Sequence, residues 1–238
     1  MLKDYIHRHA ELFKYGLKGF MHMLIAIDGI DGVGKGTQSK LLNNHLQERG
    51  LNSVLISFPQ YDSFFGKMVG EYLNGNYGGI NDINPKLTTL LYAFDRKIYF
   101  ENNNISDYYI ILCDRYVPSN ISHQGVKVNN NNQKDFINWL ESLEYETNKI
   151  PKPDIVFILD ASVESAIYNV SQKKKREYTE LSHDIHESDY NYLNKVRKMF
   201  IDLTQRDNYF LIDCEQDNKM LSIDIIFQSI IDIVKTYI

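Results

Sequence analysis

The stretch "GIDGVGKGT" at residues 29–37 decides the fold, because four glycines and a lysine crowd nine positions between two regular elements. It follows the apolar run "MLIAID" at 23–28 and leads into "KGTQSKLLNNHLQERG" at 35–50, which has helical spacing and a terminal glycine. A glycine-rich turn from a buried strand into a helix points several backbone N–H groups inward, and the helix adds the positive end of its dipole. The stretch therefore predicts a strand, a phosphate-binding loop and a helix.

The loop matches the pattern G-x-x-x-x-G-K, in which the backbone cradles nucleotide phosphates and the lysine reaches the β- and γ-phosphates. The positions expected to contact phosphate are Gly29, Gly32, Gly34, Lys35, Gly36 and Thr37. Many such loops place a serine or threonine hydroxyl on Mg²⁺ directly after the lysine, but here that residue is Gly36 and the hydroxyl comes one position later. This departure weakens the expectation of a metal ligand in the loop and leaves the phosphate site intact.

Composition and charge narrow the class of protein. The 238-residue chain is 43% hydrophobic and 24% charged, which suits a globular protein with one sizeable core. Its net charge of −5 argues against a non-specific nucleic-acid binder. No apolar run approaches the roughly 18 residues that a membrane span needs. Both cysteines end apolar runs, so we expect buried thiols rather than a disulfide, and a reduced, cytoplasmic setting.

Short apolar runs alternate with longer amphipathic segments, which is the pattern of a parallel sheet covered by helices. The expected strands are 23–28, 53–58, 108–114, 154–160 and 209–213. The expected helices are 35–49, about 64–74, about 85–102, 133–147, 162–172, 188–206 and 220–236. The strand runs are nearly continuous rather than alternating, as strands buried on both faces should be. The sequence thus predicts an α/β fold with a five-stranded parallel sheet.

No linker rich in proline, glycine or serine divides the chain, so we expect one domain over residues 23–238. Residues 1–22 form an N-terminal leader or an extra helix, and a translation start at Met21 or Met23 is compatible with the sequence. The charged stretch "SQKKKREYTELSHDIHES" at 171–188 separates two predicted helices. We interpret it as a mobile surface loop or a lid over about 171–187.

A second polar cluster, "DRYVPSNISHQG" at 114–125, follows the third expected strand. Asp114 lies at the carboxyl end of that strand beside the phosphate loop, where it can hold a hydrated magnesium ion. Arg115 can touch the oxygens of a transferring phosphate. The hydrogen-bonding groups of Ser119, Asn120, His123 and Gln124 follow on one early helical turn and suit a base edge or a sugar. A switch GTPase is excluded, because "NKIP" at 148–151 has a proline where the base-reading aspartate belongs.

Together these stretches make the chain similar to the thymidylate kinases, the dTMP kinases among the P-loop nucleoside monophosphate kinases. The matching stretches are "GIDGVGKGTQ", "SFPQYDS", "YLNGNYG", "LLYAFDR", "DRYVPSN", "PKPDIVFILD" and "DIHESDYNYL", in family order from residue 24 to beyond 200. The resemblance implies a three-layer P-loop kinase fold with helices on both faces of the sheet and a mobile lid. It also implies transfer of the γ-phosphate of ATP to dTMP, giving dTDP for dTTP synthesis, with Mg²⁺ as cofactor and a homodimer as the assembly.

The resemblance implies a role for each residue of the acceptor site. Asp31 orients the sugar hydroxyl and the phosphate end of the acceptor, and Phe58 with Pro59 shapes the pocket. Tyr92 stacks on thymine, and Arg96 lies at the edge of the base.

The second group of acceptor residues lies in the cluster at 114–125. Asn120, with Ser119, faces the base. His123 lies beside the sugar, where it disfavours a 2′-hydroxyl. Gln124 completes the expected acceptor-site set by its place on the same turn.

The chain departs from the pattern of its relatives at two positions. Many relatives have an arginine where this chain has Tyr61, and some have an arginine where it has Gly32. The catalytic cation should then come from the lid. Its candidates are Lys173, Lys174, Lys175 and Arg176. We favour Arg176, because a planar guanidinium can bind two phosphate oxygens at once. The expected catalytic residues are Lys35, Arg115, Asp31 and Arg176.

Two alternatives stay open. The first is a nucleoside monophosphate kinase of broader or different specificity, which accepts dUMP or another deoxynucleoside monophosphate. The second is a nucleotide-binding homologue with impaired catalysis, a reading that the missing arginines and the missing hydroxyl at position 36 motivate.

Overall fold

The structure is a computed structural model that describes residues 22–172 and 189–238. At its centre lies a five-stranded sheet with strand order β2-β3-β1-β4-β5, in which all paired strands are parallel. The strands are β1 Met23–Asp28, β2 Ser53–Ser57, β3 Ile110–Asp114, β4 Ile155–Asp160 and β5 Tyr209–Asp213. The five strands predicted from the sequence are confirmed, with boundaries that differ by at most two residues.

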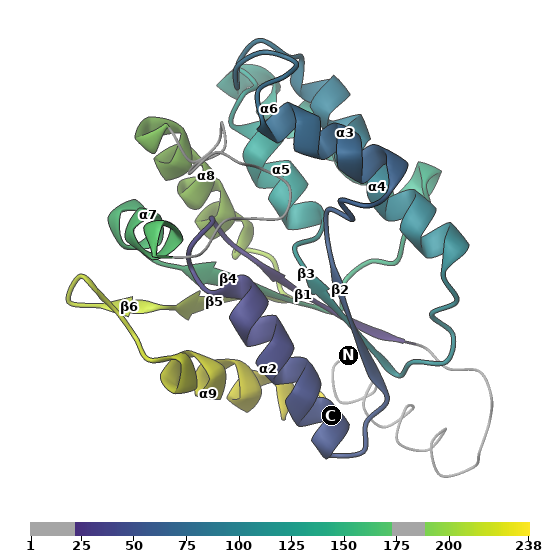
Figure 1. Ribbon diagram of the computed structural model, residues 1–238, viewed down its shortest axis with the longest axis vertical. Coiled ribbons are helices and arrows are strands. Elements are labelled where there is room, and N and C mark those ends of the chain that lie inside the picture. Colours follow the sequence, from purple (N-terminus) through teal and green to yellow (C-terminus); the bar gives the residue numbers. More distant parts are fainter. Residues whose placement is uncertain (1–21, 173–188) are drawn as a thin grey trace.

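Helices cover both faces of this sheet, as Figure 1 shows. They are α2 Lys35–Glu48, α3 Phe64–Leu73, α4 Pro85–Asn102, α5 Val117–Gly125, α6 Asn130–Glu141, α7 Val163–Ser171, α8 Tyr190–Leu203 and α9 Ile223–Val234. Helices α2 and α9 pack together on one face, while α5 contacts α4, α6 and α8 on the other. The three-layer α/β fold is therefore confirmed.

The central strands are buried on both sides, which explains their continuous apolar sequence. Strand β1 lies between β3 and β4, with Ile25 opposite Leu112 on one side and Ile155 on the other. All six residues of β1 are buried. Since parallel strands end at a common edge, Asp28 of β1 and Asp114 of β3 come close together there, beside the start of α2.

Three elements differ from the sequence prediction. The single helix expected over 133–147 is α6 followed by a π-turn, η1 Ser142–Thr147. Residues 117–125, expected to contain only one helical turn, form the whole helix α5. Nearly all its residues are buried, so the helix has no amphipathic stripe that a sequence pattern could reveal. A hairpin of β6 Glu215–Gln216 and β7 Lys219–Met220 was missed, and its turn residues Asp217 and Asn218 both have positive φ.

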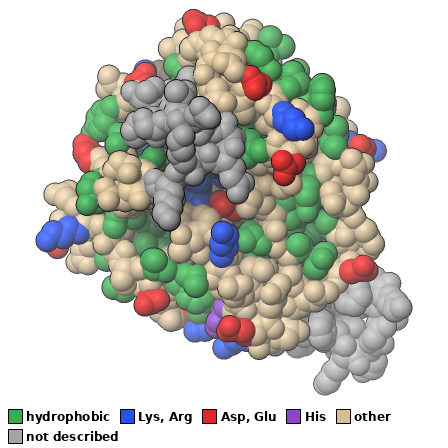
Figure 2. Space-filling view, in the orientation of Figure 1, with side chains coloured by type: hydrophobic (Ala, Val, Ile, Leu, Met, Phe, Trp, Pro, Cys, Tyr) green, Lys and Arg blue, Asp and Glu red, His purple; other side chains and the backbone are tan. Residues whose placement is uncertain are grey.

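The expected cysteine chemistry is confirmed, since Cys113 and Cys214 are both buried and not joined in a disulfide. No helix in the described part of the chain is long and apolar enough to cross a bilayer. On the face shown in Figure 2, hydrophobic side chains are scattered among polar ones, and charged side chains of both signs lie near a central hollow. The N-terminal stretch 1–21 and most of the expected lid, 173–188, lie outside the described residues.

Candidate active site

The predicted phosphate loop joins β1 to α2 and has the backbone that its glycines allow. Gly29, Gly32 and Gly34 have φ angles of 138°, 92° and 99°, in a region that other residues rarely adopt. Gly34 is the N-cap of α2 and has no side chain to offer to the first turn. The N–H groups at the start of α2 therefore have no side-chain cap and can bind a ligand, and phosphate is the group that suits them. Thr37, expected to contact phosphate, is exposed in this first turn.

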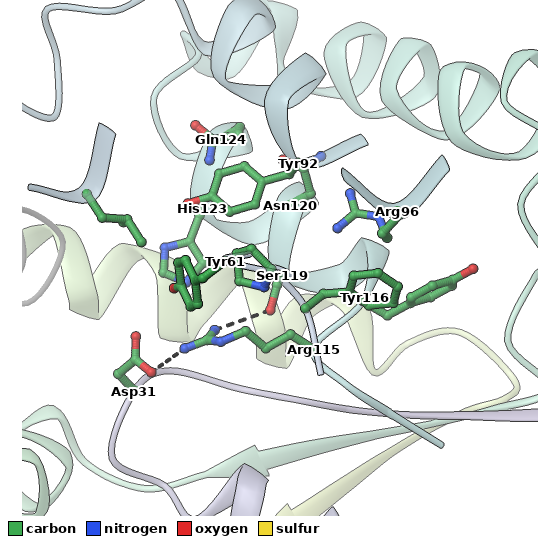
Figure 3. Close-up of a pocket in the computed structure, with 13 residues that line it drawn as sticks. Asp31, Tyr61, Tyr92, Arg96, Arg115, Tyr116, Ser119, Asn120, His123 and Gln124 are labelled. Atoms are coloured by element: carbon green, nitrogen blue, oxygen red, sulfur yellow. Dashed lines mark hydrogen bonds and ion pairs between the residues drawn. The ribbon is translucent and has the colours of Figure 1, made fainter. Parts of the chain in front are cut away.

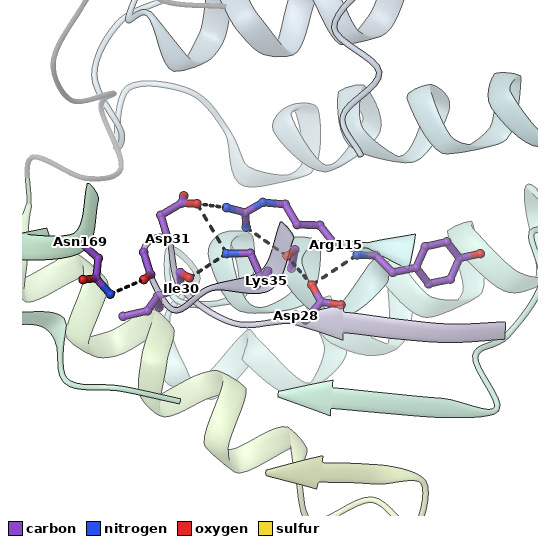
Figure 4. Close-up of polar contacts among 9 residues, drawn as sticks. Asp28, Ile30, Asp31, Lys35, Arg115 and Asn169 are labelled. Atoms are coloured by element: carbon purple, nitrogen blue, oxygen red, sulfur yellow. Dashed lines mark hydrogen bonds and ion pairs between the residues drawn. The ribbon is translucent and has the colours of Figure 1, made fainter. Parts of the chain in front are cut away.

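Gly32 is also required by a contact that the sequence did not indicate. A Cβ atom at this position would lie 2.0 Å from the carbonyl oxygen of Ala166 in α7. The Asn169 side chain, also in α7, donates to the carbonyl oxygen of Gly32 at 3.0 Å, as Figure 4 shows. Helix α7 therefore packs directly on the phosphate loop, and this contact leaves no room for a side chain such as the arginine that some relatives carry here.

Lys35 is buried at the first turn of α2 and reaches back over the loop (Figure 4). Its Nζ donates to the carbonyl oxygen of Ile30 at 2.7 Å and lies 3.5 Å from Oδ1 of Asp31. Burial, and after it the charge of Arg115, lowers the pKa of Lys35 to about 8. An anion placed here would offset both effects and favour the ammonium form.

Arg115 follows β3 and carries its guanidinium to the loop from the opposite side. It pairs with Asp31, which lies between Arg115 and Lys35. Burial opposes the charged form of Arg115, but the carboxylates of Asp31 and Asp114 outweigh burial and raise its pKa. Its backbone has φ of 67°, a left-handed conformation that a non-glycine residue adopts only when its surroundings impose it.

Asp28, the last residue of β1, is a site residue that the sequence reasoning missed. It is fully buried, and its Oδ1 accepts hydrogen bonds from the Ser119 hydroxyl and from the backbone N–H of Tyr116, the latter at 3.3 Å. Burial raises its pKa. The Ser119 hydroxyl in turn accepts a hydrogen bond from Nη1 of Arg115 at 3.4 Å. Asp28 and Ser119 together therefore hold the Arg115 side chain in place. A charged residue ending an otherwise apolar strand was the available signal.

Asp114 ends β3 next to the loop, as expected for the magnesium-holding residue. Its Oδ2 lies 3.0 Å from where a Cβ of Gly36 would be, so the glycine leaves space for this carboxylate. Asp114 and Lys35 line the same open cleft. Mg²⁺ in nucleotide sites is held by one or two carboxylates together with phosphates and waters, so Asp114 alone fits it. Within 22–172 and 189–238 no cluster of three or more candidate metal ligands occurs.

A second, narrower cavity adjoins the loop (Figure 3). The structure brings together in its lining all the residues expected at the acceptor site: Asp31, Phe58, Tyr92, Arg96, Ser119, Asn120, His123 and Gln124. Arg115 and Tyr61 line both this cavity and the open cleft, so the two spaces meet at the loop. Tyr61 thus lies at the site although it replaces an expected arginine.

The far wall of the cavity is polar and fully buried. Arg96 forms an ion pair with Glu144 of the π-turn, a residue that the sequence reasoning did not single out. Asn120 donates to the same carboxylate at 3.2 Å. Glu144 gave no sequence signal, because the acidic stretch around it reads as a solvated helix end.

His123 is held neutral by its surroundings. It is buried, and its Nδ1 lies 3.1 Å from the hydroxyl of Tyr192, which donates to the His123 carbonyl oxygen at 2.9 Å. Burial, then the charge of Arg115, lowers its pKa to about 3. The imidazole therefore carries no charge near neutral pH.

Lys127, just after α5, was also missed. Its Nζ donates to Oε1 of Gln124 at 3.0 Å and to the hydroxyl of Tyr72. Burial lowers its pKa to about 7. This contact holds the amide oxygen of Gln124 toward Lys127 and so orients the amide.

Arg176 and the three lysines before it, expected to supply the catalytic cation, lie outside the described residues. The remaining expected catalytic residues, Lys35, Asp31 and Arg115, are in contact with one another. Comparison with known proteins shows the family of the chain. A family model described as thymidylate kinase matches residues 27–225.

The chain belongs to the thymidylate kinase family.

Relatives of this family match over most of their length. The chain is 31% identical to a probable thymidylate kinase 1 of Saccharolobus solfataricus, over 83% of this chain and 91% of that protein. It is 31% identical to the thymidylate kinase of Thermosipho melanesiensis, over 90% of this chain and 98% of that protein. Among solved structures, thymidylate kinase from Candida albicans has a similar fold, with a TM-score of 0.67, 23% identity, and coverage of 90% of this chain and 92% of that one.

Proposed function

We propose that this protein is a thymidylate kinase that transfers the γ-phosphate of ATP to dTMP and releases ADP and dTDP. One observation carries the proposal. The acceptor-site residues that the family resemblance implied come from separate segments of the chain, and they line a single cavity that opens onto the phosphate loop at Asp31 and Arg115. That placement lets an acceptor phosphate in the cavity face a donor phosphate on the loop.

The donor half of the site suits ATP. The glycine-rich turn and the uncapped start of α2 would hold the β- and γ-phosphates, and Lys35 would reach the same group. Mg²⁺ would be held by Asp114, and when bound it supplies positive charge to the phosphate oxygens. Both assignments are proposals that rest on donor chemistry and position.

The acceptor half suits a pyrimidine monophosphate. Tyr92 would stack on the base, Arg96 and Asn120 would face its edge, and neutral His123 would lie beside the sugar. Arg115 would hold the phosphate end, and Asp31, which pairs with Arg115, would orient the sugar hydroxyl and the phosphate end, because both residues line both spaces. An aromatic ring together with polar groups in a narrow cavity suits a flat base.

Transfer needs positioning more than proton chemistry. An oxygen of the dTMP phosphate attacks the γ-phosphorus in line, the bond to the β-phosphate oxygen breaks, and ADP leaves. The acceptor phosphate is already largely ionised, so no general base is needed. Lys35, Arg115 and a lid cation, for which we propose Arg176, would neutralise charge on the equatorial oxygens.

We also propose that the protein acts as a homodimer. Phe64 of α3 and Leu87 of α4 are 72% and 59% exposed, and burial of such large apolar side chains favours contact with a second copy. Sedimentation at micromolar concentration tests this: a single species of one chain's mass would contradict it.

The test of function is a coupled ATP assay with dTMP, dUMP, dGMP, dAMP and dCMP. We expect dTMP to have the highest kcat/KM, and Lys35→Ala to lower kcat for dTMP by about a hundredfold or more, since one preorganised donor is worth that much. Binding of ATP and dTMP without formation of dTDP would instead show a binding protein. Near-normal turnover by Lys35→Ala would remove Lys35 from the mechanism.

A further inference from the structure

We propose that Glu144 is a positioning residue for Asn120 and Arg96. It makes Asn120 present a hydrogen-bond acceptor and Arg96 a donor to the base, so that the cavity selects a base edge with an N–H beside a carbonyl oxygen. This inference rests on the proposed function, because it specifies how the acceptor cavity recognises its substrate. Glu144 is not among the residues that line the cavity, and it would act through Asn120 and Arg96, which are.

Glu144 is an acid placed where charge is costly unless it is paired. Its side chain is fully buried, in the π-turn that follows α6. One carboxylate accepts from three groups: Nη2 of Arg96, Nε of Arg96 at 3.4 Å, and Nδ2 of Asn120 at 3.2 Å. The turn is anchored next to it, since the N–H of Ile150 donates to the Glu144 carbonyl oxygen at 3.2 Å. The carboxylate is therefore a fixed acceptor shared by two cavity residues.

The orientation of the Asn120 amide follows from its neighbours. Its Nδ2 has two partners, the Glu144 carboxylate and the carbonyl oxygen of Thr89, also at 3.2 Å. Both partners can only accept, so the amide nitrogen must point to them and the amide oxygen must point away. That oxygen, Oδ1, is buried and has no hydrogen-bond partner among the described residues. A buried acceptor without a donor in a ligand cavity calls for an N–H on the ligand.

Arg96 is oriented by the same carboxylate. Nε and Nη2 face Glu144, which leaves the N–H groups of Nη1 outside this pair. Burial opposes the charge of Arg96, but Glu144 outweighs it and raises the pKa. The aromatic ring of Tyr116, 5.9 Å away, supports the guanidinium from one side. Arg96 thus remains a charged donor next to the Asn120 acceptor, and both line the cavity (Figure 3).

An acceptor beside a donor is complementary to one kind of pyrimidine edge. Thymine and uracil present an N3–H beside a C4 carbonyl, which pairs with the Asn120 oxygen and the Arg96 guanidinium. Cytosine presents an unprotonated N3 beside a C4 amino group. Its N3 acceptor would face the Asn120 oxygen, and its amino donor would face the Arg96 guanidinium, so neither pair could form a hydrogen bond. A site whose buried polar groups are left unpaired by the wrong ligand discriminates strongly. Glu144 imposes this discrimination without touching the base.

The test compares dTMP with 5-methyl-dCMP, which differ only at positions N3 and C4 of the base. Wild-type protein and Glu144→Gln are assayed with both. A glutamine can donate toward Asn120, which allows the amide to turn, and it removes the charge that orients Arg96. We expect the ratio of kcat/KM for dTMP over 5-methyl-dCMP to fall at least tenfold, with KM for dTMP raised and KM for ATP unchanged.

Glu141→Gln is the matched control, because Glu141 also pairs with an arginine, Arg206, but neither residue lines the cavity. We expect this variant to keep the wild-type ratio. A folded Glu144→Gln with an unchanged ratio would overturn the inference, and so would an equal fall in the control. Thermal unfolding of each variant shows whether it is folded.

If Glu144→Gln does not fold, Glu144→Asp replaces it, since the shorter side chain keeps the charge but draws back from Asn120. A lower ratio of kcat/KM for dTMP over 5-methyl-dCMP, with an unchanged KM for ATP, supports the inference, and an unchanged ratio overturns it. The proposed function fails separately, if wild-type protein does not phosphorylate dTMP at all.

Discussion

At the residue scale, the site concentrates ionisable groups that are buried, as Lys35 and Asp28 are, or half-buried, as Asp31 and Arg115 are, and that must balance one another. Lys35 and Arg115 share Asp31, and Asp28 supports Arg115 from below through Ser119. Groups buried in this way are costly when one partner is removed, because the other stays desolvated. Substitutions that keep hydrogen bonds should therefore be tolerated much better than those that delete them.

Asp28 gives a direct test of that argument. Asp28→Ala leaves the Ser119 hydroxyl and the Tyr116 N–H without their acceptor, and we expect a loss of about 2–5 kcal/mol in the free energy of unfolding. Asp28→Asn keeps an acceptor oxygen, and because burial already raises the pKa of this carboxyl, we expect a much smaller loss. Urea unfolding monitored by circular dichroism measures both. Equal losses in the two variants would contradict the assigned role.

Lys127 predicts a dependence of stability on pH. Burial lowers its pKa from 10.5 to about 7, so between these values the unfolded chain holds a proton that the folded protein has released. Stability attributable to Lys127 should then rise with pH from 7 toward 10.5, and below pH 7 the buried charge is fully unfavourable. The measurement is the free energy of unfolding of wild type minus that of Lys127→Met, at pH 6 to 9. A difference that stays constant would disprove the prediction.

At the element scale, helices reach the site from outside the segments that carry the motifs. Helix α7 packs on the phosphate loop at Gly32, and the π-turn after α6 brings Glu144 to the acceptor wall. A π-turn shifts the helical register by about one residue, and such turns often occur at functional sites. The geometry of the site thus depends on contacts between elements that are distant in the sequence.

Gly32→Ala tests the packing of α7 on the loop. The added methyl would lie 2.0 Å from the Ala166 carbonyl oxygen, and φ of 92° is unfavourable for alanine, so we expect a loss of about 2–4 kcal/mol in stability or a displaced loop with weaker ATP binding. Thermal unfolding and ATP titration measure these effects. Gly34→Ala is the control for strain alone, since a Cβ there would meet nothing within 4 Å. If both variants behave alike, the contact with α7 is not the cause.

At the scale of the whole molecule, one core runs through the sheet and encloses both cysteines. Cys113 lies in β3 and Cys214 follows β5, and burial raises the pKa of each thiol. Neither thiol should react with a water-soluble disulfide reagent until the fold opens. We expect almost no reaction in the native protein and reaction of both thiols in guanidinium chloride. Rapid reaction without denaturant would show that the core opens locally.

The sequence by itself determined the order of strands and helices along the chain and the phosphate loop, and its resemblance to the thymidylate kinases implied the residues of the acceptor cavity. The order of these elements and the loop are local features, because apolar runs, glycine positions and motif spacing depend on neighbours in the chain. It also indicated Asp31, Lys35 and Arg115, which meet as expected. Arg176, the homodimer and the cytoplasmic setting remain predictions.

Only the tertiary structure decided which charges are buried together. Lys127 and Glu144 have ordinary sequence surroundings, and the importance of these two residues and of Asp28 comes from partners up to about ninety positions away. Helix α5 was underestimated for the same reason, since a helix buried on nearly every side has no periodic pattern to detect. Long-range pairing fixes desolvation and hydrogen-bond partners, and these quantities are not written in the spacing of residues along the chain.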